Sequence, residues 1–180
     1  SVQPTSTPTA TPTTAMPSRQ PTSQPTTLCA QGKWYDKKRF GCIACEIGKY
    51  GTESAAFTES ACSLCAKGTY SDQAGSEACT ACPAGTARAE KGGTAQRDCR
   101  ECLSGHYAPV GSSVCELAPR GTFSVSGAGA ATPCAKGRYA DSTGMGACLP
   151  CPLSTYNSQE GQTSCVECPA GRLTPVSYTH

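Results

Sequence analysis

The chain has 180 residues and a formal net charge of +2, and only one residue in ten is Leu, Ile, Val or Phe. This aliphatic content is too low for the core of an ordinary α/β enzyme domain, and no apolar run approaches the length of a membrane span. The balanced charge argues against nucleic acid as a partner, because such binding needs a basic stripe. With 15 cysteines, the composition indicates a chain stapled by disulfides in an extracellular or cell-surface setting.

Residues 1–28 form a leader that differs from everything after it. Thirteen of them are Ser or Thr, six are Pro, and Arg19 is the only charged residue. Prolines recurring about every four residues exclude helix and favour polyproline II, although a disordered linker has a similar composition. Ser/Thr/Pro-rich segments are also typical of O-glycosylated stalks. We expect covalent O-linked glycans on the threonines that flank the prolines, namely Thr5, Thr7, Thr9, Thr11, Thr13, Thr22 and Thr26.

From Cys29 to His180 the sequence is a tandem repeat, which we treat as a second region, 29–180. Each unit begins at the second cysteine of a C-x-x-C pair and follows the pattern C-x-x-G-x-aromatic, with a second glycine four or five residues later. Cys65-Ala-Lys-Gly68-Thr-Tyr70 is one example. About nine units of 16 to 20 residues result, the last of them incomplete; we number them 1 to 9 from their first residues, 29, 45, 65, 82, 102, 118, 134, 151 and 168.

Each conserved feature of the unit has a physical explanation. The first glycine permits a turn with positive φ immediately after the bridge, and the aromatic side chain can cover the neighbouring disulfide. The second glycine suits a hairpin turn. We therefore predict small disulfide-rich units, each an irregular β-hairpin, with almost no helix. Stacked units that contact only their neighbours should form an elongated rod.

Unit 6 suggests how the cysteines pair. It has Ala118 where the other units begin with cysteine, and Ala131 where the following C-x-x-C should start. The two alanines are separated by 13 residues, as are Cys102 and Cys115 in unit 5, so a bonded pair was lost together. The predicted bonds are Cys29–Cys42, Cys45–Cys62, Cys65–Cys79, Cys82–Cys99, Cys102–Cys115, Cys134–Cys148 and Cys151–Cys165. Spacing alone does not fix connectivity.

Two further expectations follow from this pairing. Cys168 is left unpaired in this chain, and its partner should lie beyond His180 in a longer repeat array. Unit 6 lacks about 3 kcal/mol of loop-closure stabilisation, and its interior is rich in Gly, Ala and Ser. We expect it to be the fastest-exchanging unit and a hinge in the rod.

The unit pattern resembles the ephrin-receptor-like cysteine-rich repeats, of the GCC2/GCC3 type, which are similar to the single-bridge modules of tumour-necrosis-factor receptors. The resemblance extends from Cys29 to Leu173 and implies an extracellular fold rather than a particular function. The leader resembles the Pro/Thr repeats of large surface proteins of algae and water moulds, where such segments accompany these cysteine repeats. That similarity implies a mastigoneme-like extracellular fibre.

Our leading hypothesis is a non-enzymatic structural subunit of an extracellular, glycosylated filament or surface coat, whose partners are copies of itself or related repeat proteins. The alternative is the ectodomain stalk of a receptor or adhesion protein that binds an extracellular ligand. A zinc-binding protein remains a weaker possibility, because Cys42/Cys45 and Cys62/Cys65 have zinc-ribbon spacing. A C-x-x-C oxidoreductase is weaker still, since such a site normally occurs once, at a helix N-terminus. We expect no catalytic, metal or cofactor site.

Overall fold

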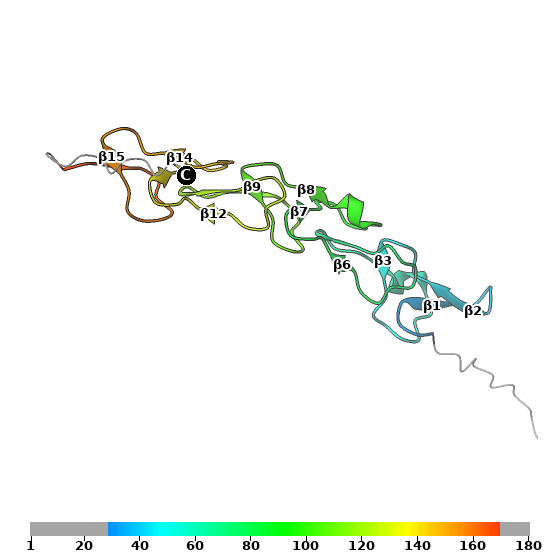
Figure 1. Cartoon of the computed structure of the whole chain (residues 1–180). Coiled ribbons are helices and arrows are strands. Elements are labelled where there is room, and N and C mark those ends of the chain that lie inside the picture. The colour runs from blue at the N-terminus through cyan, green and yellow to red at the C-terminus, as the bar shows by residue number, and fades with distance from the viewer. Residues whose placement is uncertain (1–28, 170–180) are drawn as a thin grey trace, which may run out of the picture.

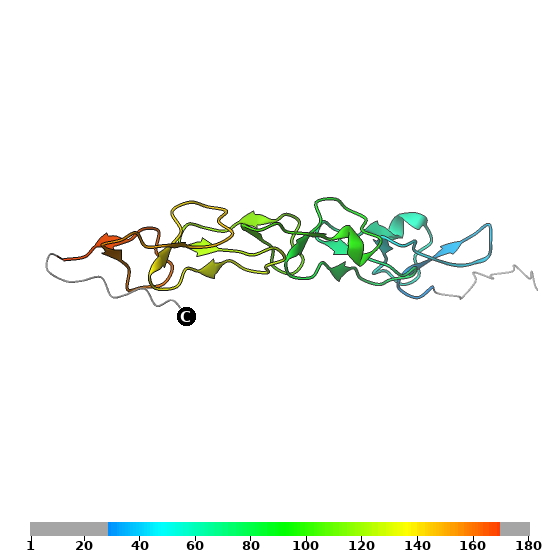
Figure 2. The same ribbon diagram turned by 45° about the horizontal axis from the view of Figure 1, so that its top comes forward.

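The computed structural model describes residues 29–169. These residues form a narrow rod in which the units follow one another from the N-terminal end, blue in Figure 1, to the C-terminal end, orange. Turning the molecule by 45° leaves the elongated outline unchanged, as Figure 2 shows. The predicted rod of tandem hairpins is therefore confirmed.

The strands pair as eight separate antiparallel hairpins, one in each of units 1 to 8. In unit 1 each strand has four residues, and in the other units each has two. The hairpins are β1 (Lys33–Asp36) with β2 (Gly41–Ala44), β3 (Lys49–Tyr50) with β4 (Ser63–Leu64), β5 (Thr69–Tyr70) with β6 (Thr80–Ala81), β7 (Thr86–Ala87) with β8 (Arg100–Glu101), β9 (His106–Tyr107) with β10 (Glu116–Leu117), β11 (Thr122–Phe123) with β12 (Thr132–Pro133), β13 (Arg138–Tyr139) with β14 (Leu149–Pro150), and β15 (Thr155–Tyr156) with β16 (Val166–Glu167).

Helical structure in residues 29–169 is confined to two single 3₁₀ turns, η1 (Glu59–Ala61) and η2 (Gln96–Asp98). Both turns lie in the two longest units, where the bonded cysteines are 17 residues apart rather than 13 or 14. The extra three or four residues of these units are thus taken up by one short turn just before the second cysteine. A 3₁₀ turn suits this role because it adds a connector of about three residues without a new element.

The core of the rod consists of cystines and small side chains. Six cysteines and Ser124 are the largest fully buried side chains, and Ala108, Ala118 and Ala140 are completely buried beside them. Aromatic side chains cover disulfides of the next unit, as expected: Tyr70 packs with Cys82 and Cys99. So little apolar surface is buried that covalent bridges must supply stability that a larger core would give.

The glycines follow the expected conformations with one difference. Each first glycine in units 1 to 7 has a positive φ between 74° and 84°, and Ser154 takes the same conformation at 63° in unit 8. The second glycines also have positive φ, but they are not part of two-residue hairpin turns. Gly75, for example, lies in a turn midway along the nine-residue connection between β5 and β6. The contacts it makes there explain its conservation among the units.

Candidate functional site

The seven disulfides are the first candidate functional feature, because the rod depends on them. Each joins the first cysteine of a unit to the first cysteine of the next C-x-x-C pair, with Cα atoms 5.5 to 5.7 Å apart. They are the seven pairs that the repeat predicts: Cys29–Cys42, Cys45–Cys62, Cys65–Cys79, Cys82–Cys99, Cys102–Cys115, Cys134–Cys148 and Cys151–Cys165. Cys168, half-buried, has no disulfide partner within the described residues.

This pairing bears directly on the zinc and redox hypotheses. The two cysteines of one C-x-x-C pair belong to different bridges: Cys62 is bonded to Cys45, and Cys65 to Cys79. A zinc knuckle needs both thiolates of a pair for the same ion, and a redox motif needs them to bond to each other. The arrangement in this rod is that of a scaffold.

Backbone hydrogen bonds join each unit to the next in a constant pattern. At the junction of units 3 and 4, the N–H of Gly68 donates to Arg88, the N–H of Ser71 donates to Gly93, and the N–H of Gly92 donates back to Cys65, at 2.8 to 2.9 Å. The equivalent three bonds recur at all seven junctions between units 1 and 8. These bonds satisfy backbone groups that would otherwise be buried without partners.

The glycines also bring together units that are not adjacent. A Cβ atom built on Gly68 would overlap the carbonyl group of Gly111, two units further along the rod. The same overlap relates Gly32 to Gly75, Gly48 to Gly92, Gly85 to Gly127, Gly105 to Gly144 and Gly121 to Gly161. The expectation that units contact only their nearest neighbours is therefore wrong. Close packing of backbones at each first glycine extends the contacts to the second neighbour, and any side chain there would separate them. We call these six contacts the glycine interlock.

Unit 6 keeps this architecture without a disulfide. The N–H of Gly121 donates to Ala140, the N–H of Ser124 donates to Met145, and Gly121 contacts Gly161. Ala118 is completely buried, as the first cysteines of units 3, 4 and 7 are. The unit therefore has the same hydrogen bonds as its stapled neighbours. The junctions on both sides of unit 6 keep all three hydrogen bonds, so no broken junction marks the expected hinge. The expected fast exchange of unit 6 stays a prediction.

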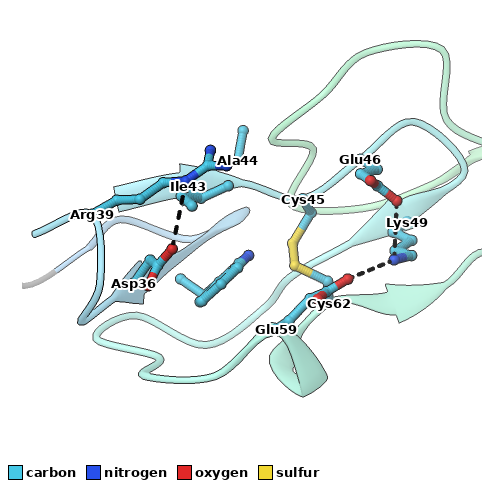
Figure 3. Close-up of a pocket in the computed structure, with 10 residues that line it drawn as sticks. Asp36, Arg39, Ile43, Ala44, Cys45, Glu46, Lys49, Glu59 and Cys62 are labelled. Carbon is cyan, nitrogen blue, oxygen red and sulfur yellow. Dashed lines mark hydrogen bonds and ion pairs between the residues drawn. A yellow bond between two sulfur atoms is a disulfide. The ribbon is translucent and has the colours of Figure 1, made fainter. Parts of the chain in front are cut away.

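A charged cavity of about 260 Å³ lies beside the junction of units 1 and 2. Figure 3 shows Lys49 between Glu46 and Glu59, with the Cys45–Cys62 bridge alongside. The Lys49 Nζ is 3.2 Å from a carboxylate oxygen of each, and the hydrogen bonds, Glu46 first, raise the pKa of Lys49 above its ordinary value. One cation of the chain thus lies between two carboxylates and leaves a single net negative charge, and its ion pair with Glu59 links β3 to η1.

A second cavity, of about 320 Å³, lies over unit 4. Arg88 occupies a position that is Ser71, Ala108 or Ser124 in other units, and the side chain is 15 % exposed. Its guanidinium is 3.6 Å from Asp98. Backbone N–H donors, that of Thr94 first, lower the pKa of Asp98. Sequence reasoning missed this pair; the signal was an arginine where the repeat has a small residue.

Several expectations concern other parts of the chain. The leader, the polyproline II conformation and the threonine glycosylation candidates Thr5, Thr7, Thr9, Thr11, Thr13, Thr22 and Thr26 all lie outside the described residues. So does the end of the repeat region, 170–180. Among the residues that the structure describes, no helix has the length and apolar character that crossing a bilayer requires.

Disulfide-stapled hairpins in tandem, with cystine cores, define an extracellular type of cysteine-rich repeat protein. A family comparison agrees: the model described as "Tyrosine-protein kinase ephrin type A/B receptor-like" matches residues 51–99, 121–158 and 137–179, more than half of the chain. The chain belongs to this ephrin-receptor-like family of cysteine-rich repeats. No curated protein matches the chain at a significant level. Repeats of this family are typically non-catalytic parts of ectodomains, and the family and the seven disulfides point to an extracellular location.

Proposed function

We propose that the chain is a non-enzymatic structural subunit of an extracellular, glycosylated filament or surface coat. The observation that supports this most is the glycine interlock, which joins each unit to the second unit beyond it. A rod in which each unit contacts only the adjacent units can bend at every junction. Contacts that span two junctions oppose such bending, and the disulfides prevent the individual hairpins from opening. Stiffness along the axis is the property that a load-bearing fibre requires.

In this proposal the leader, residues 1–28, provides the contacts between neighbouring copies. Glycans on Thr5, Thr7, Thr9, Thr11, Thr13, Thr22 and Thr26 would hold residues 1–28 extended, because a polyproline II segment has no internal hydrogen bonds. They would also offer hydroxyl groups to neighbouring copies or to related repeat proteins. The proposal includes no metal, no cofactor and no catalytic residue.

Secretory expression of the full chain tests the proposal. The glycosylated protein should form regular end-to-end or lateral assemblies as its concentration rises, visible by electron microscopy and by analytical ultracentrifugation. Mass spectrometry of the same material should find hexose or related sugars on several leader threonines. A glycosylated protein that stays monodisperse at every concentration would contradict the filament, whatever its sugar content.

The second candidate is the stalk of a receptor or adhesion protein. One observation favours it: between β1 and β2 the first unit has an exposed, positively charged loop that makes no hydrogen bond to another described unit. A stalk should be monomeric and should hold such a loop away from the surface. The same ultracentrifugation experiment therefore distinguishes the two functions.

A further inference from the structure

The loop between β1 and β2 is the most unusual surface of the rod. Residues 37–40, Lys-Lys-Arg-Phe, connect the two four-residue strands of unit 1, and all four are exposed. We call these four residues the tip. In the other units the corresponding connection carries the second glycine or its substitute, whose N–H bonds back to the preceding unit. Unit 1 is the first described unit, so the tip has no preceding unit to bond, and it makes no hydrogen bond to another described unit.

The charge at the tip is largely uncompensated. Asp36 is the carboxylate at its base: it accepts a hydrogen bond from the Lys38 backbone N–H at 2.8 Å, and its other oxygen is 3.9 Å from the Arg39 Nε. Figure 3 shows this pair across the cavity. The Arg39 side chain is nevertheless 79 % exposed, and a single exposed ion pair at this distance is weak. Three exposed cations thus lie beside one carboxylate of their own loop, because Glu46 and Glu59 of the same cavity are paired with Lys49.

Phe40 carries two costs that folding does not offset. Its φ is +50°, in the left-handed region where the other residues of the rod are glycine apart from Ala55 and Ser154. A bulky residue is strained in this conformation. The ring is also 82 % exposed, so it contributes little apolar burial. Strain at an exposed residue points to a function rather than a structural role, and aromatic residues and arginine are enriched at binding surfaces.

We infer that the tip binds an extended anionic polysaccharide, sulfated or uronic. The cations lie on three consecutive exposed residues of an open turn, and only Arg39 turns back to line the neighbouring cavity, so they do not surround a single small anion. An extended polyanion can satisfy all three, and a flat sugar ring offers Phe40 an apolar face to stack on. Polysaccharides of this kind are polyanions of the extracellular space in which the repeats belong. The inference holds for either proposed function.

Binding of the full glycosylated chain to heparin, as the sulfated probe, and to polygalacturonate, as the uronic probe, tests this inference. The variant K37S/K38S/R39S should bind at least one probe about tenfold or more weakly than the wild type in physiological salt. Raising the salt concentration should weaken wild-type binding, because exposed charges are screened. The matched control K67S/R120S/K136S removes three exposed cations from other units and should change affinity less than twofold.

The variant F40G separates binding from folding. Glycine adopts positive φ without strain, so the thermal midpoint should stay the same or rise, while affinity for the same probe should fall about threefold or more. Equal losses in the two triple variants would overturn the inference, because they would show an effect of net charge. It would also be overturned by tip-dependent binding to phosphatidylserine vesicles without binding to either polysaccharide, and by F40G binding like the wild type.

Discussion

Units 5 and 6 are neighbours in the rod and differ chiefly in one covalent bond. Unit 5 is closed by Cys102–Cys115, whereas unit 6 has Ala118 and Ala131 at the equivalent positions. Both nevertheless donate the same hydrogen bonds to the following unit, Gly105 to Ser124 and Gly121 to Ala140. The comparison separates two functions of the repeat: disulfides limit how far each hairpin can open, while backbone contacts between units set the path of the rod.

The largest expected effect comes from removing all the bridges together. Each loop closure contributes about 3 kcal/mol in the chain-entropy model, so seven contribute about 20 kcal/mol before strain is subtracted. Dithiothreitol should therefore unfold the whole rod, as followed by far-ultraviolet circular dichroism, whereas EDTA should have no effect. Unfolding by the chelator would restore the zinc hypothesis.

A pair of glycine variants tests the contacts between units. Gly68 and Gly111 face each other and have nearly equal φ, 75° and 77°, so the backbone strain of alanine, about 1 to 2 kcal/mol, is the same for both. A Cβ on Gly68 overlaps the Gly111 carbonyl, but a Cβ on Gly111 meets only Ala81 at 3.6 Å. G68A should thus destabilise the rod by about 2 to 5 kcal/mol in urea unfolding, clearly more than G111A. Equal losses would contradict the glycine interlock.

Two variants test the comparison directly: one removes the bridge of unit 5, and the other adds a bridge to unit 6. The double variant C102A/C115A should lose about 3 kcal/mol, and A118C/A131C should gain a similar amount by forming an eighth bridge. Ala118 is fully buried, as the first cysteines of units 1 to 5 and 7 are, so the new bond should form without rearrangement. Mass spectrometry of unreduced peptides would show it. If the new cysteines stay reduced while the native ones oxidise, the assumed equivalence of the two units is wrong.

A smaller effect should come from the ion pair in unit 4. The lowered pKa of Asp98 means that its carboxylate stabilises the fold at pH values above its ordinary pKa, and that this contribution disappears as the pH falls through the lowered value. D98N should have a lower thermal midpoint than the wild type at neutral pH, by less than the loss of any disulfide. The difference should shrink as the pH falls below 3.8, the ordinary pKa of this carboxyl, and disappear once the pH lies below the lowered value; a difference independent of pH would exclude the carboxylate charge as its cause.

Much of the fold could be predicted because the repeat encodes it locally. The spacing of cysteines, and the paired alanines at 118 and 131, specify which loops close, and the first glycines mark backbone turns that few other residues tolerate. The contacts between second neighbours could not be predicted, since they depend on the rotation from one unit to the next. Ala55 and Ser154 adopt positive φ at positions where most units have glycine, so the conformation follows the position in the unit and not only the residue type.

For the tip, residues 37–40, the sequence also predicts the position but not the conformation. Residues 37–40 form an exposed hairpin turn with three consecutive basic residues, a run that can be read from the sequence itself. The left-handed conformation of Phe40 could not be inferred from the sequence. It depends on which residues of β1 and β2 pair, because this register sets the length and type of the turn. The ion pair of Arg88 could not be predicted either, because Asp98 lies ten residues away in a 3₁₀ turn that only the two longest units contain.

Hydrogen exchange of the backbone amides in units 5 and 6 tests the central claim most directly. If contacts between units set the path of the rod, the amides of Gly121 and Ser124 should be protected to within about a hundredfold of those of Gly105 and Ala108, the factor that corresponds to one missing loop closure of about 3 kcal/mol. They should exchange faster than the stapled unit and far more slowly than a free peptide. Exchange of Gly121 and Ser124 at the free-peptide rate would show that unit 6 is held only by its ends, and would contradict the account.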